Sequence, residues 1–384
     1  MRRFLAPGLP ALTMACLSTL HAWADEPASY PVLEGSLDLK TYTGAFFDSG
    51  DEDGPLNGLS AKAGLGLKLS LSPIFSIHSD LTLEPVQENG PGTFRGYDDL
   101  ALYAETLYLQ ADLGANGFLA GKYDPTFGRA WDNAPGVFAT KLAEEYQLTE
   151  MWGLAGWHEI AGGASGTYTL TGNVFYADTT FLSESLFTNR GRTSLADGGP
   201  ANTGRLNSFS VTLDGEAISA LPGFSFNLGY RHLAAGTGDH ADENGFVAGL
   251  QQAFDVGRGT KLSLVGEFVY LSHAFATPDD ATYTTAGLQL ERGPWHGELA
   301  GTLHNTQLSG GGSQNDFLAQ VSGGYTFGNG LDVSLALGAG RNDGADTHVI
   351  GVRLSKSVDF KLGGWPGQVL WLGPASHGPK WPLR

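Results

Sequence analysis

Residues 58–71, GLSAKAGLGLKLSL, alternate between apolar side chains and polar or small ones. Leucine and alanine occupy the odd-numbered positions, whereas Lys62 and Lys68 fall on even-numbered ones. Because successive side chains of a β-strand point to opposite faces, the segment predicts a strand with one apolar and one polar face. Two folds accommodate such a strand. A soluble sandwich buries the leucines, whereas a membrane barrel turns them toward lipid and the lysines toward its lumen.

The start of the chain predicts a secretory signal. Arg2 and Arg3 precede an apolar stretch, and Ala22-Trp23-Ala24 supplies the small residues of a cleavage site. The only cysteine, Cys16, lies inside this stretch, and a lipoprotein site there is disfavoured because Thr13 stands where leucine is usual. We expect residues 1–24 to be a signal peptide, 25–360 a barrel and 361–384 an extension without an assigned role. The mature chain would then have no disulfide and no thiol chemistry.

Composition narrows the class of protein further. The chain has 22 basic and 40 acidic residues and a formal net charge of −18. Nucleic acid and anionic lipid are therefore poor partners for the chain as a whole. After the signal, no segment approaches the 18 or so apolar residues of a transmembrane helix. With 56 glycines and no helical periodicity, the sequence predicts an all-β fold.

The opening pattern recurs along the whole chain and predicts sixteen strands. For example, Phe75, Ile77 and Leu83 alternate with polar residues in the same way. The predicted strands are 32–47, 58–71, 74–84, 100–113, 118–123, 151–160, 166–177, 205–214, 224–233, 245–254, 260–271, 282–291, 295–304, 316–327, 331–341 and 347–360.

The connections favour the membrane barrel over the sandwich. Odd-numbered connections are mostly long and polar, as at 85–99, 124–150 and 178–204. Even-numbered ones are mostly short and rich in Gly, Pro, Asn or Asp, as at Ser72-Pro73. An outer-membrane barrel has long external loops and tight periplasmic turns, which produces this alternation. A sandwich has no reason to maintain it.

Aromatic residues support the same prediction, because they gather at both ends of the strands. One set lies beside short turns and the other beside long loops, as two interfacial girdles require. The first set is Phe75, Phe224, Phe254, Trp295 and Phe327, and the second is Phe47, Tyr176, Tyr230 and Tyr270. The sequence thus predicts an antiparallel transmembrane β-barrel.

Two segments resemble Gram-negative outer-membrane porins. The last predicted strand alternates through Ile350, Val352 and Leu354 to Phe360, like the C-terminal signature of those proteins, although here the chain continues to residue 384. The segment GKYDPTFG at 121–128 is similar to a short porin motif. The resemblance implies location in the cell outer membrane, assembly as a homotrimer and a third loop that folds inward to narrow the channel.

If the inward fold applies here, charged residues of 124–150 would line one side of the constriction. The alternative is that the loop caps the barrel from outside. The candidates are Asp124, Arg129, Asp132, Lys141, Glu144, Glu145 and Glu150.

Alternation along the strands predicts which charged groups face the lumen from the wall. Opposed acidic and basic groups across a water-filled gap would screen solutes by size and charge. The wall candidates are Lys40, Lys62, Lys68, His78, Asp80, Arg231, Lys261, Glu267, Glu298 and Arg353.

These features favour a porin that passes small hydrophilic solutes by passive diffusion, with net acidity favouring cations. The alternatives are a substrate-specific channel for a siderophore or oligosaccharide, and a non-conducting barrel acting as adhesin or anchor. No enzyme is predicted, because Ser79 points away from His78 and Asp80. No cofactor or metal centre is predicted, although the acidic segment 48–54 has ligands for loose Ca²⁺ or Mg²⁺ association, which could bridge lipopolysaccharide. Expected partners are outer-membrane lipid, lipopolysaccharide and small solutes or ions.

Overall fold

The computed structural model describes residues 30–48, 56–87, 94–342, 344–363 and 371–374. The predicted signal peptide and almost all of the acidic segment 48–54 lie outside these residues. The strands of the barrel are β1 (Val32–Asp48), β2 (Leu56–Ser70), β3 (Phe75–Pro85), β5 (Leu100–Leu113), β6 (Asn116–Tyr123), β7 (Met151–Ala161), β8 (Thr167–Ala177), β10 (Ser208–Glu216), β11 (Phe224–Leu233), β12 (Glu243–Gly257), β13 (Thr260–Ser272), β14 (Asp280–Arg292), β15 (Trp295–Gln307), β16 (Ser313–Thr326), β17 (Asp332–Asn342) and β18 (Ala345–Gly363).

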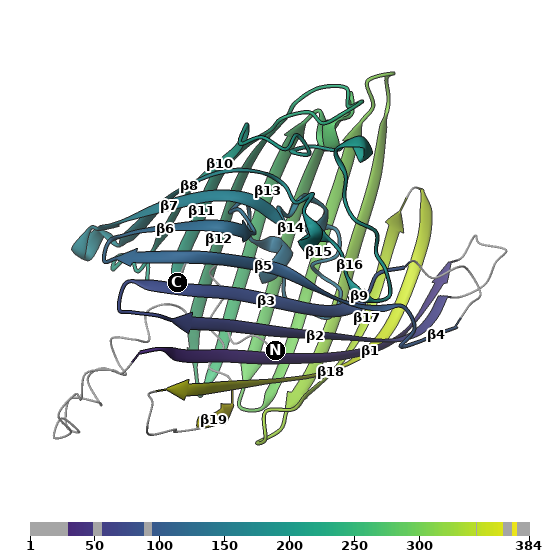
Figure 1. Cartoon of the computed structure of the whole chain (residues 1–384). Coiled ribbons are helices and arrows are strands. Elements are labelled where there is room, and N and C mark those ends of the chain that lie inside the picture. The colour runs from purple at the N-terminus through teal and green to yellow at the C-terminus, as the bar shows by residue number, and fades with distance from the viewer. Residues whose placement is uncertain (1–29, 49–55, 88–93, 343, 364–370, 375–384) are drawn as a thin grey trace.

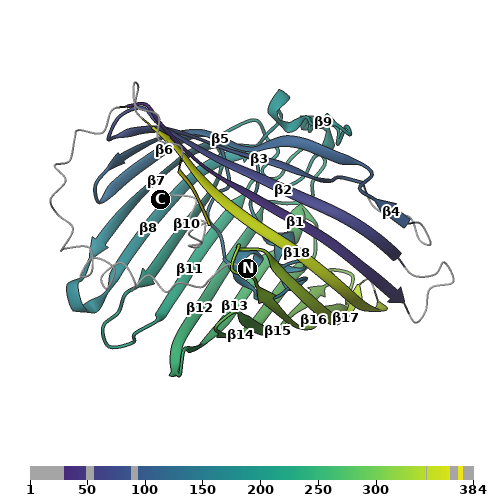
Figure 2. The ribbon, with the colours of Figure 1, turned by 90° about the horizontal axis from the view of Figure 1, so that it is seen from below.

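These sixteen strands form one closed antiparallel barrel (Figures 1 and 2). Each strand pairs with the next in sequence, and β18 returns to pair with β1 from Val32↔Gly363 to Asp48↔Thr347. Because the barrel is closed, each of the sixteen strands has a paired neighbour on both sides. A bilayer requires this, since lipid offers no hydrogen-bond partners to an unpaired strand edge. All sixteen predicted strands are therefore confirmed, with ends that differ by a few residues.

Three short strands extend the sheet beyond the ring. They are β4 (Phe94–Gly96), β9 (Leu186–Phe187) and β19 (Trp371–Pro374). β4 pairs with β2, and β9 pairs with β5 beyond the point where β6 ends. β19 pairs with Val358–Lys361 of β18, so part of the chain after Phe360 returns to the sheet.

Helices are few and short in the described residues. They are α2 (Ala130–Asn133) and the 3₁₀ turns η1 (Ala143–Tyr146), η2 (Gly163–Ser165), η3 (Phe181–Ser183), η4 (Leu195–Asp197) and η5 (Ala274–Ala276). No helix in this part of the chain is long and apolar enough to span a bilayer.

Burial is reversed relative to a water-soluble protein. On β10, Phe209 and Val211 are 37% and 42% exposed, whereas the alternating Ser210 and Thr212 are 0% and 1% exposed. β15 repeats this arrangement, with Leu299 exposed and Glu298 buried. An exposed apolar face around a polar interior is the arrangement of a transmembrane barrel. The leucines of β2 are thus on the lipid side of the wall.

The connections follow the predicted alternation with two exceptions. Connections at one end, such as 114–115, 258–259 and 293–294, are tight turns, whereas 124–150 and 178–207 at the other end are long. The predicted connections 305–315 and 342–346 are shorter than expected, because strand pairing continues through most of them: β15 and β16 are joined by 308–312, and β17 and β18 pair up to Asn342 and Ala345. Phe75, Phe254, Trp295 and Phe327 are exposed beside the tight turns, as predicted.

The lipid-facing surface makes a stability prediction. Leu299, 58% exposed on β15, pairs across the sheet with Leu288 and Val321, which are also exposed. Leu299→Lys should destabilise the barrel by about 2–4 kcal/mol if this position is near the bilayer midplane. Reversible urea unfolding in lipid vesicles measures this cost. Leu308→Lys, in the loop beyond the same strand, should change stability by no more than about 0.5 kcal/mol, and an equal cost for both variants would contradict the assignment of the lipid face.

Candidate channel and its inserted segment

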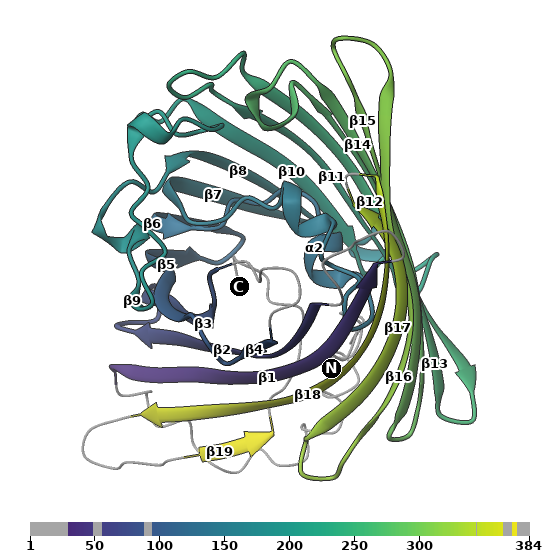
Figure 3. The same cartoon turned by 90° about the vertical axis from the view of Figure 1, so that its right-hand side faces the viewer.

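The connection between β6 and β7, residues 124–150, lies inside the ring of strands and is called here the inserted segment. Figure 3 shows α2, which belongs to it, within the barrel. Its central anchor is Glu267 of β13, which is 6% exposed. The Glu267 carboxylate accepts hydrogen bonds from the backbone N–H of Arg129 at 2.7 Å, that of Ala130 at 3.0 Å and the Tyr146 hydroxyl at 2.6 Å. One wall carboxylate therefore holds both α2 and η1.

Arg231 of β11 is a second anchor and is 2% exposed. Its guanidinium donates to the carbonyl of Tyr146, forms an ion pair of 2.6 Å with Glu243 and lies 4.4 Å from the centroid of the Phe127 ring. Glu243 also accepts the Phe275 backbone N–H at 2.7 Å. Because both charges are paired and bonded, their burial is compensated.

The middle of the inserted segment is attached to β16 and β18. The Phe138 N–H donates to Gln320 at 2.7 Å, and Arg353 donates to the carbonyl of Gly136 at 3.0 Å. Gly136 has a φ of 131°, and a Cβ there would lie 1.4 Å from the Gln320 amide nitrogen. Gly351 of β18 similarly leaves room for the Phe138 ring, 2.5 Å from its ideal Cβ. Glycine is thus required on both sides of this contact.

The two ends of the inserted segment are tied together at the mouth of the barrel. The Glu150 N–H donates to Asp124 at 2.8 Å. Glu150 also pairs with buried Lys122 at 2.8 Å and with Arg190, a residue of the 178–207 connection. Burial raises the pKa of Asp124 well above its usual range, and the Glu105 carboxylate raises it further, while the Glu150 N–H opposes the shift.

Three further charged residues of the inserted segment are exposed. Lys141, Glu144 and Glu145 are all solvent-accessible, although Glu145 also accepts a hydrogen bond from Tyr283 at 2.8 Å. Glu144 lies within electrostatic range of Lys62 and Tyr42 on the opposite wall. This edge of the inserted segment therefore faces titratable side chains of β1 and β2.

The β1–β3 wall carries charges of both signs. Lys62 is 47% exposed and forms an ion pair of 2.7 Å with Glu84, and Lys40 is its direct cross-strand neighbour. Lys68 lies opposite His78 on β3. The His78 ring stacks on Tyr108 with centroids 4.9 Å apart, and Asp80 accepts from Thr106 at 2.8 Å.

Several of the predicted wall residues have partners inside the barrel. Arg231, Glu267 and Arg353 face inward, but they hold the inserted segment instead of facing it across water. Glu298 is also enclosed, because it contacts His296 and accepts from Ser322 at 2.7 Å. On the segment itself, Arg129 is committed to an ion pair with Asp214, and Asp132 is half-buried. Lys261 lies at the tight-turn end of β13.

Several anchoring residues were not predicted as site residues. Alternation along the strands does predict that the Asp214 and Gln320 side chains point into the barrel, so their direction could have been found from the sequence. Tyr146 acts through both its hydroxyl and its carbonyl, and the Tyr283 hydroxyl on β14 donates to Glu145. The anchoring roles of these two tyrosines follow from the path of the inserted segment, and sequence spacing does not reveal that path.

The interior also contains histidine contacts. Ser76, and not Ser79, lies beside His78, with 2.9 Å between the Ser76 hydroxyl and Nε2. Asp80 is bonded to Thr106, so these residues do not form a serine–histidine–aspartate relay. His296 lies between Glu298 and Asp332, and its Nε2 is 2.9 Å from Asp332. The described residues contain no group of three or more His, Cys, Asp or Glu placed to hold a metal ion.

Comparison with known proteins identifies the fold. No protein-family model matches the chain, and no curated protein sequence matches it. Solved structures do match: the outer-membrane channel DcaP of Acinetobacter baumannii has 14% identity and a TM-score of 0.52, covering 85% of this chain and 96% of that one. OpdK of Pseudomonas aeruginosa, solved with vanillate, has 10% identity and a TM-score of 0.51, covering 85% and 98%. A loop-deleted OmpT of Vibrio cholerae has 10% identity and a TM-score of 0.51, covering 85% and 100%.

The chain therefore shares the fold of these outer-membrane proteins. Its apolar outer face belongs in a bilayer, and its polar interior contains an inserted segment. The chain has the fold of a transmembrane β-barrel.

Proposed function

We infer that this barrel is a porin, through which small hydrophilic solutes diffuse passively past a constriction formed by the inserted segment. The observation that carries the proposal is the one-sided docking of residues 124–150. Between its two tied ends, the segment bonds to strands β8–β18, at Asn173, Asp214, Arg231, Glu267, Gln320 and Arg353. This arrangement leaves the space beside β1–β3 as the route for solutes.

The charges along this route favour cations. Glu84, Glu105 and Glu144 all act electrostatically on Lys62, which is itself paired with Glu84. Fixed negative charge raises the local concentration of cations. Glu144 on one side of the constriction and Lys62 on the other also create an electric field across it. This field orients dipolar solutes.

Reversal potentials in planar bilayers test this proposal. We expect purified protein to form steady open channels and, under a KCl gradient, to give a potential with the sign of K⁺ preference. Clear Cl⁻ preference would refute the cation preference alone. An absence of conductance from folded protein would refute the porin and favour an anchoring role. The homotrimer and the contact with lipopolysaccharide stay predictions.

A further inference from the structure

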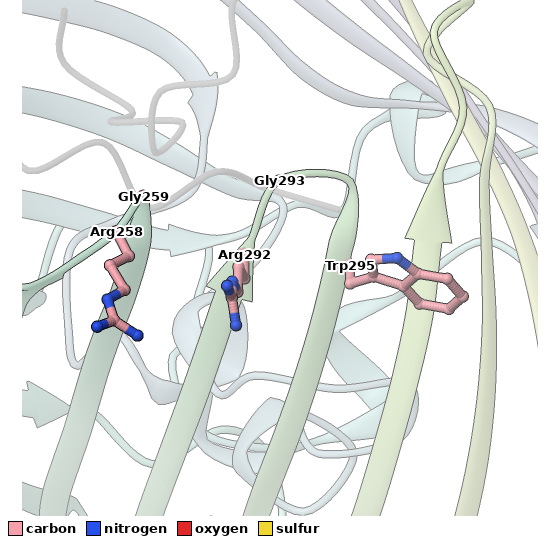
Figure 4. Close-up of a pocket in the computed structure, with 5 residues that line it drawn as sticks. All are labelled: Arg258, Gly259, Arg292, Gly293 and Trp295. Carbon is pink, nitrogen blue, oxygen red and sulfur yellow. The ribbon is translucent and has the colours of Figure 1, made fainter.

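A shallow hollow on the barrel surface lies at the tight-turn end and is lined by Arg258, Gly259, Arg292, Gly293 and Trp295 (Figure 4). It is formed by the β12–β13 and β14–β15 turns, which lie side by side. Cross-strand pairs connect them: Gly257 pairs with Thr260, Thr260 with Arg292, and Arg292 with Trp295. Neighbouring strands are about 4.8 Å apart, so the side chains of Arg258 and Arg292 are long enough to converge on one small anion.

The hollow opens on the lipid side of the wall. On β14, Arg292 points to the same face as Leu288 and Leu290, which are both exposed. Gln289 points to the other face and is buried. Trp295, 64% exposed, has the parity of Leu299 and packs edge-on against Tyr325 with centroids 4.8 Å apart. The two arginines therefore lie where the apolar belt meets water, beside an aromatic row that marks the bilayer interface.

Among the described residues, the two arginines have no paired counter-charge. In the part of the chain that the structure describes, neither Arg258 nor Arg292 has an ion-pair or hydrogen-bond partner, although acidic residues outnumber basic ones by 40 to 22 in the sequence. Two like charges side by side repel each other, and a bound anion would remove that cost. The guanidinium fork is suited to the oxygens of a phosphate.

We propose that this hollow binds the phosphate of an anionic glycerophospholipid in the periplasmic leaflet. Arg258 and Arg292 hold the phosphate from two sides, and Trp295 packs beside the glycerol region. An acyl chain then lies on the exposed leucines of β14 and β15, including Leu290 and Leu299. The tight turns mark the periplasmic end, where the leaflet consists of phospholipid. The negative charge of the whole chain does not prevent this binding, because the contact is local and screened over about 10 Å.

Native mass spectrometry of the purified folded protein, titrated with phosphatidylglycerol or phosphatidylcholine, tests the site. The comparison uses R258Q/R292Q and, as a control with equal charge change, R192Q/R205Q in the long 178–207 connection. We expect wild type and control to bind phosphatidylglycerol in preference to phosphatidylcholine. R258Q/R292Q should lose about tenfold or more of its affinity for phosphatidylglycerol, and R258K/R292K should retain an intermediate affinity.

Three outcomes would overturn the proposal. Equal binding of phosphatidylglycerol by wild type and R258Q/R292Q would show that the arginines do not recognise it. Equal binding of both lipids by the wild type would show that the site does not prefer an anionic headgroup to a zwitterionic one. Displacement of the lipid by millimolar inorganic phosphate would identify a soluble anion as the ligand. Heat-modifiability on gels shows whether R258Q/R292Q folds. If it does not, the proposal is tested by the affinity of R258K/R292K and by the lipid preference of the wild type.

Discussion

Glu267→Ala is expected to release the inserted segment from the barrel wall and to increase single-channel conductance, with larger current fluctuations. The substitution leaves the N–H groups of Arg129 and Ala130 and the Tyr146 hydroxyl without their acceptor. Each buried polar group left unpaired costs about 1–3 kcal/mol, so the docked arrangement loses several kcal/mol. The barrel strands themselves retain their pairing, and the protein should still insert into bilayers.

Glu267→Gln is the matched control for this result, because the amide keeps one acceptor oxygen. It should give a conductance between those of wild type and Glu267→Ala. Hydrogen exchange of residues 124–150 provides an independent readout, since a released segment loses protection. Unchanged conductance together with unchanged protection in Glu267→Ala would show that the other anchors suffice and that Glu267 does not control the segment.

Charge substitutions on the two sides of the route should move ion selectivity in opposite directions. Lys62→Ala/Lys68→Ala removes two cations from the β1–β3 wall and should increase cation preference, whereas Glu144→Gln/Glu145→Gln should decrease it. A unit charge about 8 Å from an ion changes the energy of that ion by about 0.5 kcal/mol in water. Since cations and anions respond oppositely, each charge near the route should change the permeability ratio by about fivefold at low salt.

Reversal potentials at two KCl concentrations measure this change, which should diminish as salt rises. Arg192→Ala/Arg205→Ala serves as the control for a change of net charge away from the inner wall. Both lysines lie in a strand whose pairing depends on its backbone, so the Lys62→Ala/Lys68→Ala variant should retain its stability. A shift of the same sign in the lysine and glutamate variants would exclude the proposed route between them.

The barrel could be predicted from sequence because its signal is repeated many times. Alternation of period two assigns each strand residue to lipid or lumen, as Phe209 and Ser210 illustrate, and long and short connections alternate around the ring. Local errors arose where strand pairing outlasts the apolar pattern. β18 continues to Gly363, and the hairpin from β17 to β18 is paired almost to its tip.

The arrangement of the interior was less accessible, for a physical reason. Alternation predicts that Arg231, Glu267 and Arg353 point into the barrel. It does not predict whether their polar partners are water molecules or another part of the chain. The partners of these residues are mainly backbone groups of Arg129, Gly136 and Tyr146, and backbone groups carry no residue-specific signal in the sequence. The anchoring role therefore appears only once the path of 124–150 is known.

This dependence on backbone partners has a consequence for how such a channel diversifies. The wall recognises the inserted segment partly through main-chain N–H and carbonyl groups, including the N–H groups of Ala130 and Phe138, which nearly every residue type supplies. The exposed side chain of Glu144 accepts a hydrogen bond from Thr140 of the same segment, so it can be exchanged without disturbing these attachments. Within one scaffold, filtering properties and assembly are separable, so that related barrels could acquire new permeants through a handful of codon changes while their folding is preserved.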